Sequence, residues 1–171
     1  MKYMCNICYE IFKEEYFPNA EKMATENKYH RCPAIKCYGS IMPIEDGVVE
    51  AISILNKKNY FTMSSGKGNV YLYDENVYVK FMFDYYEFAN IPPQFEYIKE
   101  KMLLRGTTED DPAYSDERQI ALFDEAKNLL KWAMELPEHE LADDCEFRDE
   151  ILENTGKIEN QSKHLHWKYA S

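Results

Sequence analysis

Two cysteine pairs lie near the start of the chain, Cys5-Asn6-Ile7-Cys8 and Cys32-Pro33-Ala34-Ile35-Lys36-Cys37. Two residues separate the cysteines of the first pair, four separate those of the second, and 23 residues lie between the pairs. Each pair is short enough to lie on one tight turn, and four thiolates complete the closed tetrahedral shell that structural zinc prefers. The spacing therefore predicts a structural Zn²⁺ site in a zinc knuckle or ribbon. Its predicted ligands are Cys5, Cys8, Cys32 and Cys37.

Two neighbouring residues bear on the predicted site. Gly39 follows the second pair, where a small residue helps a turn to direct backbone N–H groups at sulfur. His30 can replace one ligand, although we expect it to lie beside the ligands or at the surface. Because four thiolates leave no position for a catalytic water, the predicted metal is structural. The alternative interpretation is four unrelated reduced thiols in a core.

The residues around the cysteines divide into three blocks. Residues 1–45 form the predicted zinc block, which has little core of its own, so we expect the metal to contribute about 10 kcal/mol to its folding. Residues 46–106 are predicted to form a helix, a three-stranded antiparallel sheet and a further helix. Residues 107–171 are predicted to be helical and acidic, with a frayed tail. The predicted fold class is therefore α+β.

The central block shows helical and then strand-like patterns. Apolar residues at helical spacing from Val48 to Leu55 predict its first helix. A β-meander follows, with turns at residues 64–68 and 74–76. After Pro92-Pro93, helical spacing returns and predicts a helix that stops at Gly106. The predicted strands are 60–63, 69–73 and 77–83, and the second helix uses Phe95, Ile98, Met102 and Leu103.

The last block is predicted to contain two helices. Ser115 can cap the first, and Pro137 ends it. The second is expected around Cys145, and the chain is expected to fray from Gln161. The apolar stripe of the first helix is predicted to consist of Ile120, Phe123, Ala126, Leu130, Ala133 and Met134.

The composition indicates a globular protein. The chain has 171 residues, of which 45% are hydrophobic, and this is enough for one compact domain, with or without a small appendage. No apolar run approaches ~18 residues, and the first residues lack the apolar stretch of a signal peptide. Five cysteines in such a chain favour metal or free thiols over disulfides. We therefore expect a cytoplasmic location.

The charge is unevenly distributed. The net charge of the chain is −11, whereas residues 107–160 alone carry 17 acidic and 5 basic side chains. This excess disfavours binding to bare nucleic acid, because phosphate contacts need Lys and Arg. It instead favours attraction to a basic protein surface, without excluding an ordinary solvated helix face. The densest acidic clusters, which are the candidate partner-binding residues, are Asp110, Asp111, Asp143, Asp144 and Glu146.

The sequence shows no complete catalytic set. Ser65-Gly66-Lys67-Gly68 is similar to a phosphate-binding loop but lacks its full frame, so we interpret it as a turn. Cys145 is expected to be a buried structural thiol. No Ser/His/Asp order, Rossmann fingerprint or zinc-protease motif is present. We therefore expect that the protein is not an enzyme, and an activity at the Ser65 turn is the least supported alternative.

Residues 4–81 carry a resemblance to a known group. The carrying elements are the Cys5–Cys8 pair, His30-Arg31-Cys32-Pro33 with Cys37, and Ile52-Ser53-Ile54-Leu55-Asn56-Lys57-Lys58-Asn59-Tyr60 before a Ser-Gly turn. This stretch resembles small zinc-knuckle proteins of phages that infect low-GC Gram-positive bacteria. Relatives of that kind are expected to have a Cys and a His flanking the turn, whereas this chain has Met63-Ser64-Ser65-Gly66-Lys67.

The resemblance implies a counter-defence function. Small acidic phage proteins include anti-CRISPR inhibitors, and some of these block the RNA-guided DNA nuclease of type II systems. That nuclease holds nucleic acid in positively charged channels, which suit an acidic partner. The expected function is a non-enzymatic inhibitor that binds a basic nucleic-acid-handling host protein and blocks DNA loading. The alternative is a zinc ribbon that binds nucleic acid or modulates transcription through Lys13, Lys22, Lys28, Arg31 and Lys36.

Overall fold

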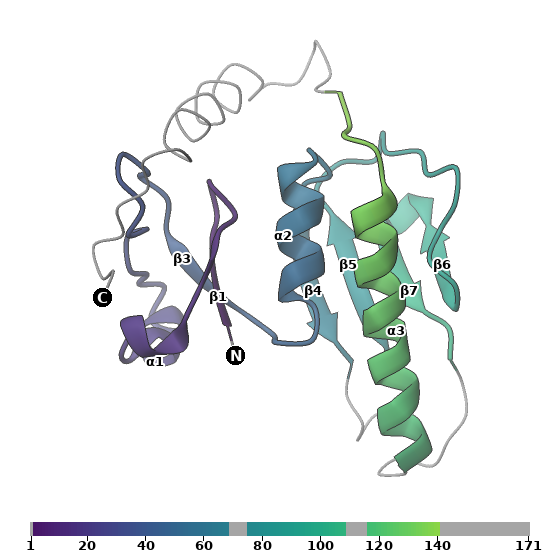
Figure 1. Ribbon diagram of the computed structural model, residues 1–171, viewed down its shortest axis with the longest axis horizontal. Coiled ribbons are helices and arrows are strands. Elements are labelled where there is room, and N and C mark those ends of the chain that lie inside the picture. Colours follow the sequence, from purple (N-terminus) through teal and green to yellow (C-terminus); the bar gives the residue numbers. More distant parts are fainter. Residues whose placement is uncertain (1, 69–74, 109–115, 141–171) are drawn as a thin grey trace. The chain divides into compact units, whose positions relative to one another are not determined.

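The computed structural model describes residues 2–68, 75–108 and 116–140 (Figure 1). The described residues form two compact units, one of residues 2–43 and one within residues 44–139. The described residues form two β-sheets and three α-helices, and the strand pairs are antiparallel, which confirms the α+β class. None of the described helices is long and apolar enough to cross a membrane.

The first unit is built on a small sheet of order β2-β1-β3. Tyr3 of β1 pairs with Phe12 of β2 in antiparallel register. The rings of Tyr3 and Phe12 pack on Phe17, at centroid distances of 5.7 and 5.8 Å. This aromatic group and the cysteines form one buried cluster. The elements are β1 (Lys2–Cys5), β2 (Ile11–Phe12), η1 (Glu14–Tyr16), α1 (Ala20–Thr25) and β3 (Ile41–Ile44).

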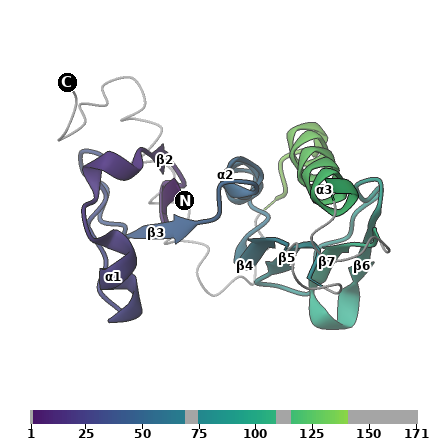
Figure 2. The ribbon, with the colours of Figure 1, turned by 90° about the horizontal axis from the view of Figure 1, so that it is seen from below.

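The second unit is a four-stranded antiparallel sheet of order β4-β5-β7-β6. Helices α2 and α3 both lie on one face of this sheet (Figure 2). Val77, Val79 and Phe81 of β5 are fully buried beneath them, as the predicted third strand required. The elements are α2 (Val49–Lys57), β4 (Thr62–Lys67), β5 (Val77–Phe81), β6 (Phe95–Ile98), η2 (Lys99–Lys101), β7 (Leu103–Gly106) and α3 (Asp116–Glu135).

The predicted turn at residues 64–68 is wrong for most of its length. Residues up to Lys67 belong to β4, where Gly66 pairs with Tyr78 of β5. A Cβ at Gly66 would lie 2.5 Å from the Tyr78 ring, so glycine is needed for ring packing. Gly68, with φ of +81°, is the residue that adopts a turn conformation. The predicted strand at residues 69–73 lies outside the described residues.

The helix predicted after Pro92-Pro93 is also wrong. Residues 95–106 form the β6–β7 hairpin, in which Phe95 pairs with Gly106. β7 also pairs with β5, through Tyr78 and Arg105. The apolar spacing of this short segment is compatible with a helix. The segment forms strands instead, because backbone hydrogen bonds pair it with a distant part of the chain.

Helix α3 exists where it was predicted and ends before Pro137. Its predicted apolar stripe is wrong for three of its members, although Ala133 is buried as predicted. The side chains of Ile120, Phe123 and Met134 are 60%, 65% and 63% exposed. The buried positions are Arg118, Leu122, Glu125, Leu129, Trp132 and Ala133. Two members of this set, Arg118 and Glu125, are charged, and neither belonged to the predicted stripe. The further helix around Cys145 and the tail lie outside the described residues.

Hydrogen bonds explain how these charges are buried. Glu125, which is 0% exposed, accepts hydrogen bonds from Asn76 Nδ2, Val77 N, and both N and Oγ1 of Thr108. Arg118 donates to the carbonyl oxygens of Thr108 and Glu75 and to Asn76 Oδ1. The network joins α3 to the start of β5 and the residues after β7. Buried charges are tolerated when they are satisfied in this way.

The segment after α2 holds the end of α3. Lys58 Nζ donates to the carbonyl oxygens of Ala133, Met134 and Leu136, at 2.9, 2.8 and 2.6 Å. Tyr60 Oη donates to Pro137 O at 2.8 Å. The lysine therefore satisfies carbonyl groups that the helix leaves without partners, and its charge complements the helix dipole.

Candidate metal centre

The four cysteines of the predicted site come together in the first unit. Their Sγ atoms all lie within 4.8 Å of one another. The Sγ atoms of Cys5 and Cys37 are 3.6 Å apart, and those of Cys8 and Cys32 are 3.7 Å apart. Both distances are far longer than a disulfide bond of about 2.05 Å, and all four cysteines are free thiols.

Regular structure positions both pairs. Cys5 is the last residue of β1, so the first pair turns directly off the small sheet. The second pair lies in the loop between α1 and β3, and an antiparallel bridge between Arg31 and Ser40 closes this loop. Ser40 also joins the two turns, because its N–H donates to Asn6 Oδ1 at 2.8 Å and its carbonyl accepts from Asn6 N at 3.0 Å.

Backbone N–H groups point at the sulfurs within each turn. Ile7 N lies 3.3 Å and Cys8 N 3.5 Å from Cys5 Sγ, and Ala34 N lies 3.4 Å from Cys32 Sγ. Such N–H···S bonds stabilise negative charge on sulfur, as a metal-binding thiolate requires. Sequence reasoning did not name these donors, although their positions inside the short Cys-to-Cys turns were the available signal.

Gly39 is needed because the chain passes very close to the cluster. A Cβ at this position would overlap Cys5 Sγ. The backbone of Gly39 also forms a hydrogen bond that lowers the pKa of Cys37. The glycine expected after the second pair therefore serves both close approach and N–H donation to sulfur.

The thiols influence one another's ionisation. Hydrogen bonding, first of all to Cys32, lowers the pKa of Cys5 and of Cys37. Hydrogen bonding to neighbouring cysteine sulfurs raises the pKa of Cys8 and of Cys32. Burial, together with the charge of Cys5 and Cys8, raises the pKa of Tyr9 to about 12. The protein alone thus favours charge on only part of the cluster, and a cation would favour it on all four sulfurs.

The donor set fits a tetrahedral thiophilic metal. With metal–sulfur distances of about 2.3 Å, a regular tetrahedron has sulfur–sulfur edges of about 3.8 Å. Two separations in the cluster, 3.6 and 3.7 Å, are close to this value. Cys5, Cys8 and Cys32 are buried and Cys37 is half-buried, so protein surrounds most of the cluster. Such an arrangement is compatible with metal binding, and four thiols complete a tetrahedral shell without a further protein ligand.

His30 is engaged elsewhere. Its Nε2 lies 3.3 Å from Pro18 O, and its ring packs on Phe17 at a centroid distance of 5.5 Å. The imidazole therefore helps to hold the loop before the second pair against the aromatic core.

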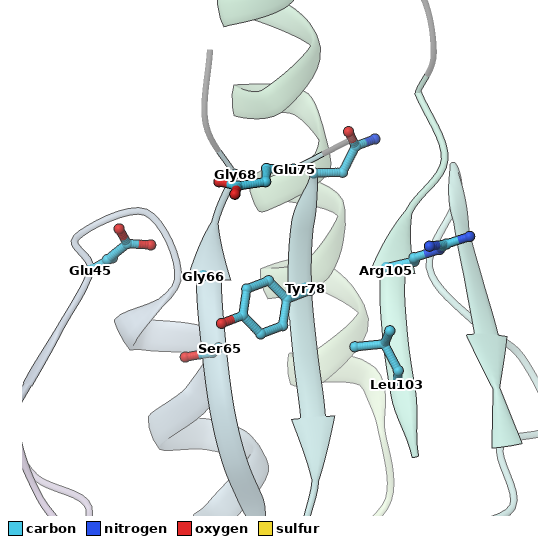
Figure 3. Close-up of a pocket in the computed structure, with 9 residues that line it drawn as sticks. Glu45, Ser65, Gly66, Gly68, Glu75, Tyr78, Leu103 and Arg105 are labelled. Atoms are coloured by element: carbon cyan, nitrogen blue, oxygen red, sulfur yellow. The ribbon is translucent and has the colours of Figure 1, made fainter. Parts of the chain in front are cut away.

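A separate hollow lies in the second unit, on the sheet face opposite α3 (Figure 3). Its volume is about 520 Å³, and Tyr78 lies across its floor. Two of its charged side chains already have partners, since Glu45 accepts from Lys67 N at 2.6 Å and Arg105 pairs with Glu96. Ser65, which was predicted to lie in a turn, lies on strand β4 and lines this hollow. The side-chain pairs of the hollow do not come together at a single reactive position.

The candidate partner-binding residues are not placed by the structure. Asp110, Asp111, Asp143, Asp144 and Glu146 all lie outside the described residues. The basic residues of the alternative, nucleic-acid-binding interpretation are described, and all five are exposed: Lys13, Lys22, Lys28, Arg31 and Lys36.

Comparisons with known proteins add no relative. No family model matches the chain, and neither a curated protein nor a solved structure is similar to it.

Proposed function

We propose that this chain is a zinc-stabilised binding protein that acts on a basic, nucleic-acid-handling partner and is not an enzyme. The observation that carries the proposal is the four-cysteine cluster, whose thiols would fill every position of a tetrahedral zinc ion. A zinc ion held in this way would stabilise the first unit and would have no open position for a water or substrate.

The partner is proposed from charge. Residues 107–160 carry a net charge of −12, which would attract a basic surface and speed association. Channels that hold nucleic acid are such surfaces, and the RNA-guided DNA nuclease of type II CRISPR systems is the partner we propose. The mechanism is steric and electrostatic: the bound protein would occupy the channel and prevent DNA loading.

Metal analysis of natively purified protein tests the first part. One Zn²⁺ per chain is expected, and a thiol-modifying reagent should release it as the four ligand thiols react, out of five thiols in the chain. Protein without bound metal, or with a metal content unchanged by Cys5→Ser, would contradict the zinc site. Cys145→Ser is the matched control, because the fifth cysteine is not a predicted ligand.

A DNA-cleavage assay tests the second part. The protein is mixed with a guide-loaded type II nuclease before or after target DNA, and stoichiometric inhibition is expected only when it is added first. Reversing charges at Asp110 and Asp111 to Lys should weaken inhibition, whereas the same charge change at exposed Glu14 and Glu15 should not. Absence of inhibition across nucleases from suitable hosts would reject this partner.

A second candidate function is direct nucleic-acid binding by the first unit. The guanidinium of Arg31 lies 5.7 Å from the ring centroid of Tyr38, and the Tyr38 side chain is 69% exposed. An exposed ring beside cations is a typical platform for an unpaired base. Gel-shift titration at low salt discriminates the candidates, because no retention of single- or double-stranded nucleic acid would remove this one.

A further inference from the structure

Helix α3 exposes a regular apolar series to solvent. Ile120, Phe123 and Met134 are more than half exposed, and Leu130 is half-buried. With exposed Lys127 between them, these positions follow one another at intervals of three, four, three and four residues. Lys127 Nζ lies 5.7 Å from the Phe123 ring centroid, so the lysine lies alongside the ring. We call these five residues the outer series of α3.

The outer series is not the margin of the packed face. The positions that face the sheet, from Arg118 to Trp132, follow their own spacing of four, three, four and three residues. At about 100° per residue, the centres of the two series lie about 160° apart around the helix. Single exposed apolar side chains are ordinary, but a three–four repeat over four turns is the pattern of a seam between two helices.

We propose that the outer series pairs with the same series of a second copy of this chain, with the two helices antiparallel. The charges beside the series favour this occupant. Glu117 and Asp124 lie toward the N-terminal end of α3, and Lys131 lies on the same flank toward the C-terminal end. The exposed charges of α3 are of both signs, with Asp116, Glu117, Asp124 and Glu135 against Lys127 and Lys131. Asp124 and Lys131 lie on one flank of the series and can pair with each other across a two-fold axis, which favours a second copy of this helix.

The antiparallel arrangement selects one register. Ile120 would pack against Leu130 of the second copy, and Phe123 against Lys127 of the second copy. In this register Asp124 lies beside Lys131 of the second copy, and the two-fold axis generates that ion pair twice. A shift of one heptad would instead bring Lys131 beside Lys131, or Asp124 beside Asp124. A parallel pair would place Lys127 against Lys127.

Sedimentation of the full, zinc-loaded chain tests the proposal. Because the seam offers only about four layers, a dissociation constant on the order of 10 μM is expected. Measurements belong at physiological salt, where the Debye length of about 8 Å screens repulsion between two acidic chains. A chain that remains monomeric at concentrations about tenfold above that constant overturns the proposal.

Two sets of variants test the face and the register. Phe123→Asp should raise the dissociation constant by at least about tenfold, whereas Met63→Asp, at another exposed apolar side chain, should leave it unchanged. Asp124→Lys and Lys131→Asp should each weaken the dimer about threefold, and the double variant should recover to within about twofold of the original. A dissociation constant that Phe123→Asp leaves unchanged would overturn the proposed pairing. A double variant that dimerises no more tightly than the single variants would overturn it as well. Circular dichroism spectra confirm that each variant is folded.

Discussion

The two units of this chain are stabilised by different means. In the first unit, three cysteines of the proposed metal centre occupy core positions beside Tyr3 and Phe17. In the second unit, Val79, Phe81 and Leu104 are fully buried between the sheet and its helices, and the Glu125 network joins α3 to the sheet. The first unit should therefore depend on a metal, and the second on apolar burial and satisfied polar groups.

Loss of a cysteine ligand should produce the largest difference in stability between the two units. Cys32→Ser, or removal of metal with a chelator, should abolish a contribution of about 10 kcal/mol to folding of the first unit. Hydrogen exchange should then become fast in residues 2–43 and stay slow in the strands of residues 44–139. Equal loss of protection in both units would show that they fold as one cooperative body.

Glu125→Ala should destabilise the second unit and leave the stability of the first unchanged. The substitution removes the acceptor of four hydrogen bonds from Asn76, Val77 and Thr108 and leaves these buried donors without a partner, so a loss of about 3–5 kcal/mol is expected. Urea denaturation measures the loss, and metal content should not change. Asp124→Ala is the control, because Asp124 is the acidic residue next to Glu125 and its side chain is exposed. Similar losses of stability for the two variants would contradict the role of the network.

Gly39→Ala tests the close approach to the proposed metal centre. An added methyl group would displace Cys5 Sγ, so we expect metal affinity to fall and the first unit to lose about 1–3 kcal/mol, a typical cost of overpacking. Competition with a chromophoric chelator measures the affinity. Gly47→Ala, where a Cβ would approach only the Lys67 side chain, should keep the original metal affinity.

Lys58→Met should have the smallest effect of the four. It removes a charged donor from three carbonyl groups at the end of α3, and a loss of about 1–2 kcal/mol is expected in the second unit. Thermal unfolding followed by Trp132 fluorescence is a suitable measurement. Lys101→Met, at an exposed lysine of this unit, should change stability little, and an equal effect would contradict the special role of half-buried Lys58.

The elements that sequence reasoning predicted well depend on local information. The helix after Asp46-Gly47 and strand β5 each have a repeated apolar pattern that matches their own period. By contrast, residues 95–106 have a pattern compatible with a helix and form a hairpin, because β7 finds β5 as a partner. The sequence of these twelve residues alone does not indicate that β5 is the partner of β7.

The face of α3 shows the same limit. Two three–four series coexist in this helix, and most members of the predicted buried stripe belong to the outer, exposed one. The packed series contains Arg118 and Glu125, whose burial depends on Asn76 and Thr108 from elsewhere in the chain. A local pattern cannot show that such partners exist, because they are supplied by the packed sheet.

By itself, the sequence determined that four thiols come together, since two short turns can each present two sulfurs wherever the rest of the chain goes. It also determined the mixed α+β class, through the periods of its apolar residues. Only the tertiary structure decided which strands pair and which face of α3 meets the core. Those choices depend on hydrogen bonds and packing between residues far apart in the chain, whose partners exist only once the chain has folded.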